Sequence, residues 1–152
     1  MKKTLGLAVI CAIGLAGCQS TTTNMAPAAV ATSGSLTLKQ VRLNAGVPPL
    51  KYNGALTRAA QHHANDMVRR GFYAHVNPDG VNFDKRVSDE GYCVASLAEN
   101  LTEKAKTEEQ AIQMWMNSPP HRRNMLNPKY THVGIGSAGG YWVMDLGGKC
   151  VR

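Results

Sequence analysis

Histidine and glutamate are the residues of this sequence whose types suit catalysis or metal binding. Two of the five histidines, His75 and His121, lie beside turn residues, where functional side chains are commonly held by a rigid scaffold. Glu99 lies in an otherwise uncharged stretch from residue 93 to 102, so a buried position for it would require a polar partner. Two histidines and one glutamate are a known ligand set for a zinc ion with an open coordination position.

The spacing of these three residues leaves their role open. The gaps between them are long, and no short motif such as His-Glu-x-x-His joins them. Spacing alone therefore favours a structural Glu99 over a metal ligand. Alternatively, Glu99 holds His75 or His121 as a general base. Hydrolysis would also need a nucleophile, and Ser118 is better explained as the residue that ends a helix before two prolines.

The other three histidines have ordinary structural explanations. His62 and His63 are neighbours inside a predicted helix, and adjacent residues do not share a helical face. We expect one of them to be exposed and the other to flank the core. His132 begins a predicted strand, which is compatible with a surface position.

Hydrophobic periodicity predicts mainly helices first and a β-hairpin at the end. In the long helix the apolar stripe is Leu56, Ala60, Ala64, Met67 and Val68, and in the last helix Ala111, Met114 and Trp115 are expected to face the core. Asn53 and Thr107 are expected N-caps, Gly71 is an expected C-cap, and residues 118–120 are expected to end the last helix. The predicted helices are 36–44, 53–70, 82–90 and one that starts at 107, and the predicted strands are 132–137 and 141–146. This order predicts an α+β domain.

The N-terminus has the pattern of a bacterial lipoprotein signal. Two lysines precede a short apolar stretch, which ends in Leu15-Ala16-Gly17-Cys18. This resembles the lipobox, whose cysteine receives diacylglycerol and a further acyl chain such as palmitate. We therefore expect residues 1–17 to be removed, Cys18 to be the lipid anchor, 18–34 to be a tether and 35–152 to be one folded domain. Gln19 favours the outer membrane if the cell has one.

Charge and cysteine content fit an exported protein. The net charge of +7 falls to +5 once the signal and its two lysines are removed. No basic run with interleaved aromatics is present, so a nucleic-acid partner is not expected. Cys93 and Cys150 are the cysteines that remain besides Cys18, and we expect them to form a disulfide in an oxidising compartment. The sequence gives no reason to expect anything but a monomer.

Several segments together resemble the CAP (SCP-like) superfamily. Ala98-Glu99-Asn100-Leu101 resembles its Glu-Asn signature, and residues 115–124 match the bacterial form Trp-x-x-Ser-x-x-His-x-x-Asn. Residues 43–50, 56–64, 74–80 and 130–136 resemble its other segments. The resemblance implies an α-β-α sandwich with a central antiparallel sheet and a wide cleft lined by His75, Glu99 and His121. The family's second glutamate falls near Ser118, so this chain is expected to hold Zn²⁺ or another divalent cation only weakly.

Three functions are compatible with this resemblance. The first is a non-enzymatic binding module for a lipid or other small ligand in the cleft lined by His75, Glu99 and His121. The second is a divalent-metal-assisted hydrolase or peptidase that uses the same cleft. The third is a cell-surface interaction protein. The sequence therefore leaves open whether the chain is an enzyme.

Overall fold

The computed structural model describes residues 36–93 and 96–149. The predicted signal peptide, the predicted lipidation site Cys18, the predicted tether and Cys150 lie outside the described residues. No helix in the described part of the chain is long and apolar enough to span a bilayer.

A four-stranded sheet forms the centre of the domain, with the strand order β1-β3-β4-β2. Strands β2 (Leu97–Thr102), β3 (Tyr130–Ala138) and β4 (Tyr141–Gly148) are antiparallel, as expected. The short β1 (Lys51–Tyr52) adds a parallel edge beside β3, so the sheet is mixed. The β3–β4 hairpin turns at Gly139 and Gly140, which both have positive φ, as two-residue hairpin turns favour.

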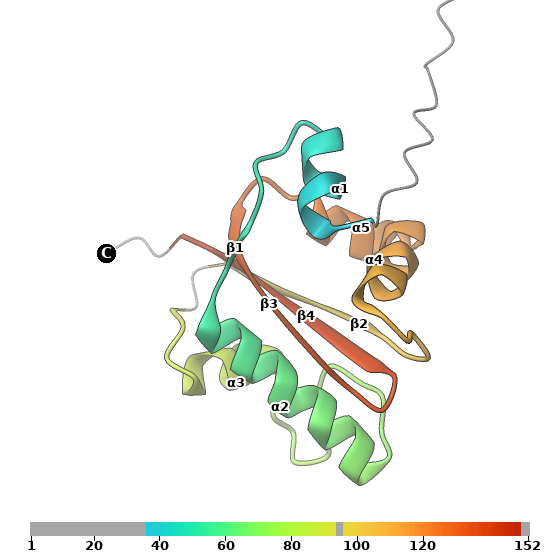
Figure 1. The fold of residues 1–152 in the computed structure, drawn as a ribbon. Coiled ribbons are helices and arrows are strands. Elements are labelled where there is room, and N and C mark those ends of the chain that lie inside the picture. Colours follow the sequence, from blue (N-terminus) through green and yellow to red (C-terminus); the bar gives the residue numbers. More distant parts are fainter. Residues whose placement is uncertain (1–35, 94–95, 150–152) are drawn as a thin grey trace, which may run out of the picture. The chain divides into compact units, whose positions relative to one another are not determined.

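Helices cover both faces of the sheet (Figure 1), which confirms the predicted α-β-α layering. Helices α2 (Gly54–Arg70) and α3 (Phe83–Asp89) pack on one face. Helices α1 (Leu38–Asn44), α4 (Glu108–Asn117) and α5 (Pro119–Met125) pack on the other face, around the buried Trp115. Neighbouring residues of a strand therefore point into different layers.

Helix α2 lies directly against β3 because two glycines leave room for its backbone. A Cβ atom on Gly134 would lie 2.1 Å from the carbonyl carbon of Leu56, and one on Gly136 would lie 2.3 Å from the backbone nitrogen of Gln61. The expected caps are present, since the Asn53 side chain accepts from two backbone N–H groups and Gly71 ends the helix with positive φ.

The predicted apolar stripes are correct except at one position in each helix. Leu56, Ala60, Ala64 and Met67 are fully buried, whereas Val68 is 46% exposed. At about 100° per residue, position 68 lies about a third of a turn from Leu56, whereas position 63 lies on the same side as Leu56. The stripe is therefore completed by His63. In α4, Ala111 and Trp115 are buried but Met114 is 42% exposed, so its prediction as a core residue is wrong.

Ser118-Pro119-Pro120 ends α4 as predicted, but it also begins α5, which the sequence interpretation missed. Proline is tolerated in the first turn of a helix because its missing N–H would have no partner there. The Ser118 side chain makes no capping hydrogen bond. Its place at the helix boundary agrees with the structural explanation given for this serine.

Candidate functional site

Glu99 forms the centre of the candidate site, on the edge strand β2. Its side chain is completely buried, and both carboxylate oxygens accept hydrogen bonds. His75 Nδ1 donates to Oε1 at 2.7 Å, and Arg86 Nη2 donates to Oε2 at 2.7 Å. A buried carboxylate is stable only with such partners. Sequence reasoning anticipated the need for a partner but did not identify Arg86, whose position in α3 gave no signal of this contact.

His75 extends from the loop between α2 and α3, and its side chain is 52% exposed. Because Nδ1 donates to Glu99, the neutral imidazole presents Nε2 as an acceptor. Arg86 also donates to the backbone carbonyl of His75 at 3.1 Å and so holds the loop in place. The result is an oriented, half-exposed imidazole above a buried carboxylate.

Asn100 positions the second histidine on the other side of the strand. It is fully buried, and its side-chain amide donates to the carbonyl of His121 at 3.0 Å. Its Oδ1 accepts from Asn124 at 2.8 Å, which fixes the same helix at a second point. Burial and the neighbouring His75 lower the pKa of His121. The two histidines therefore influence each other, although they come from different layers.

Asp145 is a second buried carboxyl group beside Glu99, and sequence reasoning missed it. It lies directly opposite Glu99 in the β2–β4 register and is only 1% exposed. Burial first, and then the Glu99 carboxylate, raise the pKa of Asp145 well above its usual range. A charged residue inside an otherwise apolar strand was the available signal, because it must have a special environment.

The donor set does not form a three-ligand zinc site in this arrangement. Among residues 36–93 and 96–149, no group of three His, Cys, Asp or Glu side chains is placed to hold a metal ion. Both oxygens of Glu99 are already engaged, one of them by the positively charged Arg86. Zinc binding at His75 and His121 stays a prediction.

The remaining histidines have structural positions. His63 is buried, and its Nε2 donates to the carbonyl of Ala74 at 2.9 Å, next to the loop residue His75. His62 is exposed and pairs with Glu90. This confirms the expectation of one exposed and one core-flanking residue. His132 is half-buried and contacts Tyr92.

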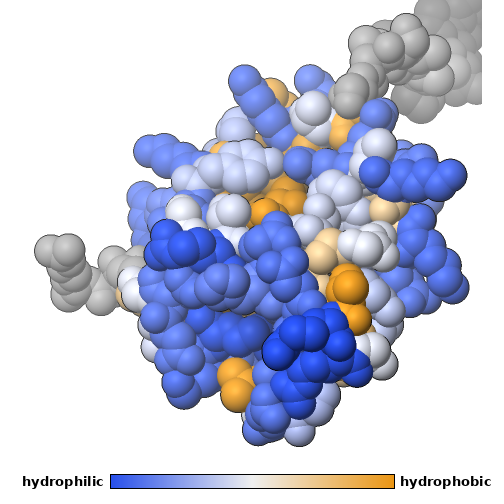
Figure 2. Space-filling view, turned by 60° about the horizontal axis from the view of Figure 1, so that its bottom comes forward, coloured by the Kyte–Doolittle hydropathy of each residue, from blue (hydrophilic) through white to orange (hydrophobic). Residues whose placement is uncertain are grey.

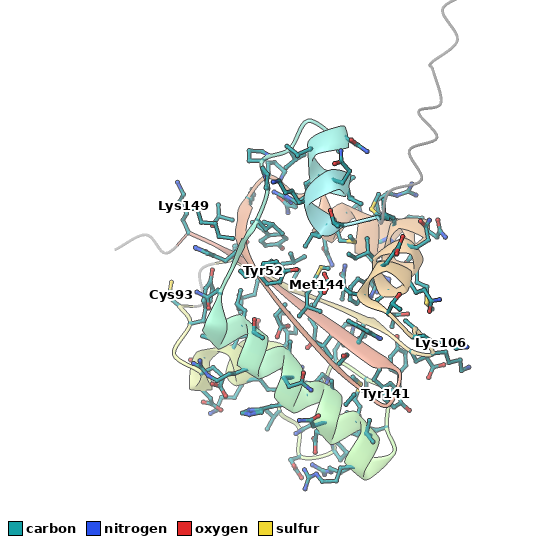
Figure 3. The ribbon with its side chains drawn as sticks, viewed as in Figure 1. Tyr52, Cys93, Lys106, Tyr141, Met144 and Lys149 are labelled. Atoms are coloured by element: carbon teal, nitrogen blue, oxygen red, sulfur yellow. The ribbon has the colours of Figure 1, made fainter. Side chains whose placement is uncertain are left out.

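An apolar cavity of about 310 Å³ lies at the opposite edge of the sheet, where β1 approaches α1 and α4. Leu38, Leu50 and Val133 contribute its apolar lining, and Tyr52, which is labelled in Figure 3, also lines it. A second cavity of about 290 Å³, which includes Trp142, shares Tyr52 with the first. His75, Glu99 and His121 line neither cavity, so the histidine site and these cavities are separate.

Comparisons with known proteins agree with this fold. A family model described as the cysteine-rich secretory protein family, CAP, matches residues 37–146. The uncharacterized protein YkwD of Bacillus subtilis is 34% identical over 111 residues, which cover 71% of this chain and 43% of that protein. The uncharacterized membrane protein YlbC of the same organism is 25% identical, over 70% of this chain and 31% of that protein. The chain thus spans less than half the length of these curated relatives.

Solved structures show the same fold. An extracellular protein with an SCP domain from Bacillus anthracis superposes with a TM-score of 0.71 at 23% identity, covering 74% of this chain and 38% of that one. An outer surface protein from Borrelia burgdorferi gives a TM-score of 0.66 at 17% identity, covering 74% of this chain and 87% of that one. These likenesses support the layered architecture described above.

Proposed function

Because the chain belongs to the cysteine-rich secretory protein (CAP) family, we propose that it is an extracytoplasmic, lipid-anchored module that binds a lipid or another small hydrophobic ligand. The apolar cavity beside Tyr52 is the observation that carries this proposal. Small-molecule sites are concave and mostly apolar, with few polar groups that orient the ligand. The names of similar proteins, "extracellular" and "outer surface", agree with a location outside the cytoplasm.

The cavity combines an apolar interior with polar groups at its wall, which come from Thr37, Lys39, Tyr52 and Glu108. The Tyr52 hydroxyl donates to Glu108 at 3.1 Å, which joins β1 to the start of α4. Burial and Glu108 raise the pKa of Tyr52 to about 12, so the phenol keeps its proton at physiological pH. Each methylene of a bound chain that leaves water would contribute about 0.8 kcal/mol. A hydrocarbon chain with a polar head matches this lining.

Palmitate is a suitable probe for this proposal. Binding of palmitate to the mature chain would be measured by native mass spectrometry and by titration of a fluorescent fatty acid. Leu50→Glu places a carboxylate in the lining and should weaken binding by about tenfold or more. Leu43→Glu is the matched control, because Leu43 is 47% exposed and does not line the cavity. Equal affinity in both variants would contradict the proposal.

A second candidate function is hydrolysis with His75 as general base. The buried Glu99 carboxylate at 2.7 Å from Nδ1 holds the ring in the tautomer that a base requires. Nε2 would take a proton from a water molecule as the water oxygen attacks the ester carbonyl carbon. The tetrahedral intermediate would then collapse with cleavage of the ester C–O bond, which releases the carboxylic acid and the alcohol or phenolate. His75→Ala should abolish hydrolysis of p-nitrophenyl acetate, whereas His62→Ala, an exposed histidine, should retain it. Activity that survives in His75→Ala would rule this function out.

The membrane anchor and the cell-surface alternative need tests in cells. Cys18→Ser should remove metabolic labelling by palmitate and release the domain from the membrane fraction. If the protein acts on a neighbouring cell, protease added to intact cells should cleave it. Protection from protease until the envelope is opened would favour an inward-facing binding module instead.

A further inference from the structure

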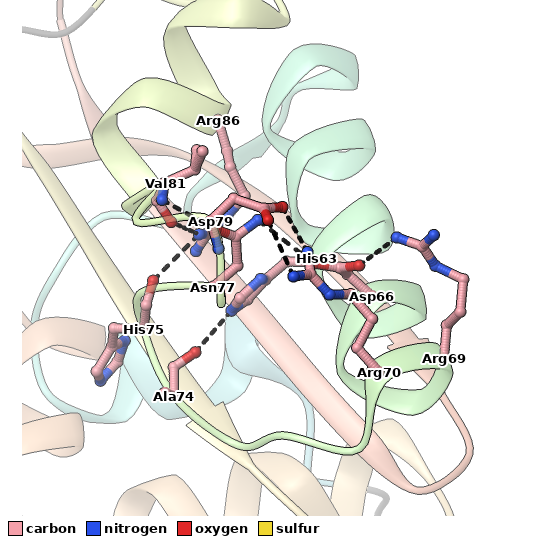
Figure 4. Close-up of polar contacts among 10 residues, drawn as sticks. All are labelled: His63, Asp66, Arg69, Arg70, Ala74, His75, Asn77, Asp79, Val81 and Arg86. Carbon is pink, nitrogen blue, oxygen red and sulfur yellow. Dashed lines mark hydrogen bonds and ion pairs between the residues drawn. The ribbon is translucent and has the colours of Figure 1, made fainter.

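A polar cleft of about 430 Å³ lies on the other face of the sheet from the apolar cavity of about 310 Å³. Its walls come from α2, the loop that follows it and α3 (Figure 4), and every lining side chain is polar or charged. The surface in Figure 2 is correspondingly hydrophilic over much of its area. Arg86 belongs both to this cleft and to the Glu99 network, so the cleft adjoins the histidine site.

The charges in the cleft are already neutralised by partners. Each arginine of the lining has an acidic partner: Arg69 pairs with Asp66, Arg70 with Asp79 and Arg86 with Glu99. An anionic ligand would therefore have to displace a carboxylate before it gained a cationic partner. A lining made of polar side chains equally disfavours a lipid, because it offers a hydrocarbon chain no apolar surface to bury. These two facts leave neutral polar molecules as the best-matched class.

Two buried polar atoms of the lining residues have no hydrogen-bond partner within the described part of the chain. They are Nδ1 of His63 and Nε of Arg86. His63 Nε2 donates to the Ala74 carbonyl, so Nδ1 carries a lone pair and can only accept. Burial lowers the pKa of His63, which keeps the ring neutral. Arg86 Nε–H can only donate. Leaving either group unsatisfied costs about 1–3 kcal/mol.

A hydroxyl group satisfies either kind of atom, because it both accepts and donates hydrogen bonds. Both side chains belong to the lining of the same cleft. The cleft is far larger than the roughly 30 Å³ that one water molecule occupies. We propose that the polar cleft binds a neutral, hydroxyl-rich ligand, one or two sugar units of a glycan, whose hydroxyl groups hydrogen-bond to Arg86 Nε and His63 Nδ1.

This site is independent of the proposed lipid-binding function. The apolar cavity contacts α1 and α4, whereas the cleft is formed by α2 and α3. A variant that loses saccharide binding in the cleft should therefore keep palmitate binding in the apolar cavity, and the reverse should also hold. Palmitate binding therefore serves as an internal check on the fold of every variant of the cleft.

The test uses the full mature chain labelled with ¹⁵N, with N-acetylglucosamine and its β-1,4-linked dimer as neutral probes and inorganic phosphate as the anionic probe. Saccharide should shift the Arg86 Nε–H resonance with millimolar affinity. Asn65→Phe fills the cleft from the exposed side of α2 and should weaken saccharide binding by about tenfold or more. Asn117→Phe is the matched control. Each variant removes one Gln-to-Asn hydrogen bond between residues i and i+4 of a helix, but Asn117 does not line the cleft.

Several results would overturn the proposal. Absence of any saccharide-induced shift would mean that water alone satisfies the two buried atoms. A shift by phosphate without one by saccharide would mean that the cleft selects anions. Equal saccharide affinity in Asn65→Phe and Asn117→Phe would place binding elsewhere. A larger shift with the dimer than with the monomer would support a glycan chain as the source of the ligand.

Discussion

Replacement of Arg42 by methionine should destabilise the domain strongly, because the buried guanidinium of Arg42 donates hydrogen bonds to backbone carbonyls and methionine cannot. Arg42 is 1% exposed and donates to four backbone carbonyls, those of Pro48, Met125, Asn127 and Tyr130. Two of these carbonyls lie at or just beyond the C-terminal end of α5. A cation is favourable there because the last carbonyls of a helix lack partners. The guanidinium therefore ties α1 to the helix that carries His121.

The cost can be worked from these contacts. The hydrogen bonds to Met125 and Tyr130 are buried, so Arg42→Met leaves two carbonyls without partners or water. At about 1–3 kcal/mol for each unsatisfied carbonyl, the sum is about 2–6 kcal/mol. Burial also lowers the pKa of Arg42, a sign of the desolvation cost that the variant relieves. We therefore expect a net loss of about 3 kcal/mol, a large part of a typical domain's stability.

Urea unfolding followed by tryptophan fluorescence would measure this loss, with the slope of the transition checked for constancy. Arg58→Met is the matched control, because Arg58 is 57% exposed and pairs with Glu90. An exposed pair contributes at most about 1 kcal/mol. If Arg42→Met cost less than about 1 kcal/mol, or no more than Arg58→Met, the reasoning about buried carbonyls would be wrong.

Three other perturbations test single contacts. Gly136→Ala should destabilise the domain by about 2 kcal/mol or more, because the new methyl group would overlap the backbone of Gln61. Thermal unfolding would measure this loss. Gly54→Ala is the control, because its methyl group would meet only the flexible end of Arg58 at 3.5 Å. Asp145→Asn should gain stability relative to the native chain as pH rises from about 4. Because the pKa of Asp145 is raised, the folded native chain keeps a proton that the unfolded chain has released, so the free energy of unfolding of the native chain falls as pH rises above about 4. Urea unfolding of both chains at pH 4 and pH 8 would measure this. An equal change in both chains would contradict a raised pKa of Asp145. Alkylation without reductant should leave Cys93 and Cys150 unmodified in the exported protein, and two modified thiols would exclude the disulfide.

The predicted disulfide has support from the described strands. Gly148 donates from its backbone N–H to the carbonyl of Ser96 at 2.9 Å, at the end where β2 and β4 pair. Cys93 lies shortly before this point and Cys150 shortly after it, and Figure 3 shows Cys93 and Lys149 on the same side of the domain. Closure of the long loop between the cysteines would contribute about 4 kcal/mol on the chain-entropy model. Cys150 lies outside the described residues, so the bridge stays a prediction.

The elements that the sequence predicted well are those with local signals. Asn53, Asn82 and Thr107 each cap a helix through a side-chain oxygen, and such caps act within three residues. The helix bounds could therefore be predicted from short segments of the sequence. The hairpin could also be predicted from a local signal, because Gly139 and Gly140 supply the positive φ values that its turn requires.

The elements that the sequence concealed depend on distant partners. In β2, Glu99 and Asn100 interrupt the apolar alternation, and each is stable there only because groups from other layers bind it. A strand with two buried polar residues does not have the usual strand pattern. The contacts of Arg86 and Asp145 with this strand likewise join segments that are far apart in sequence. Residue type and context therefore singled out His75, Glu99 and His121, but only the family resemblance placed them together in one cleft.

The alternation of β2 explains why these two polar residues belong together. Glu99 points toward the α2–α3 layer and holds His75, whereas Asn100 points the other way and holds the backbone of His121. Consecutive residues of one strand thus set the relative position of two histidines from different layers. The Asn100 amide holds the His121 backbone rather than its ring, so the loss of this hydrogen bond should change the position of α5 relative to β2 and with it the position of the His121 ring. Any ligand that needs both histidines therefore depends on Asn100 as much as on Glu99.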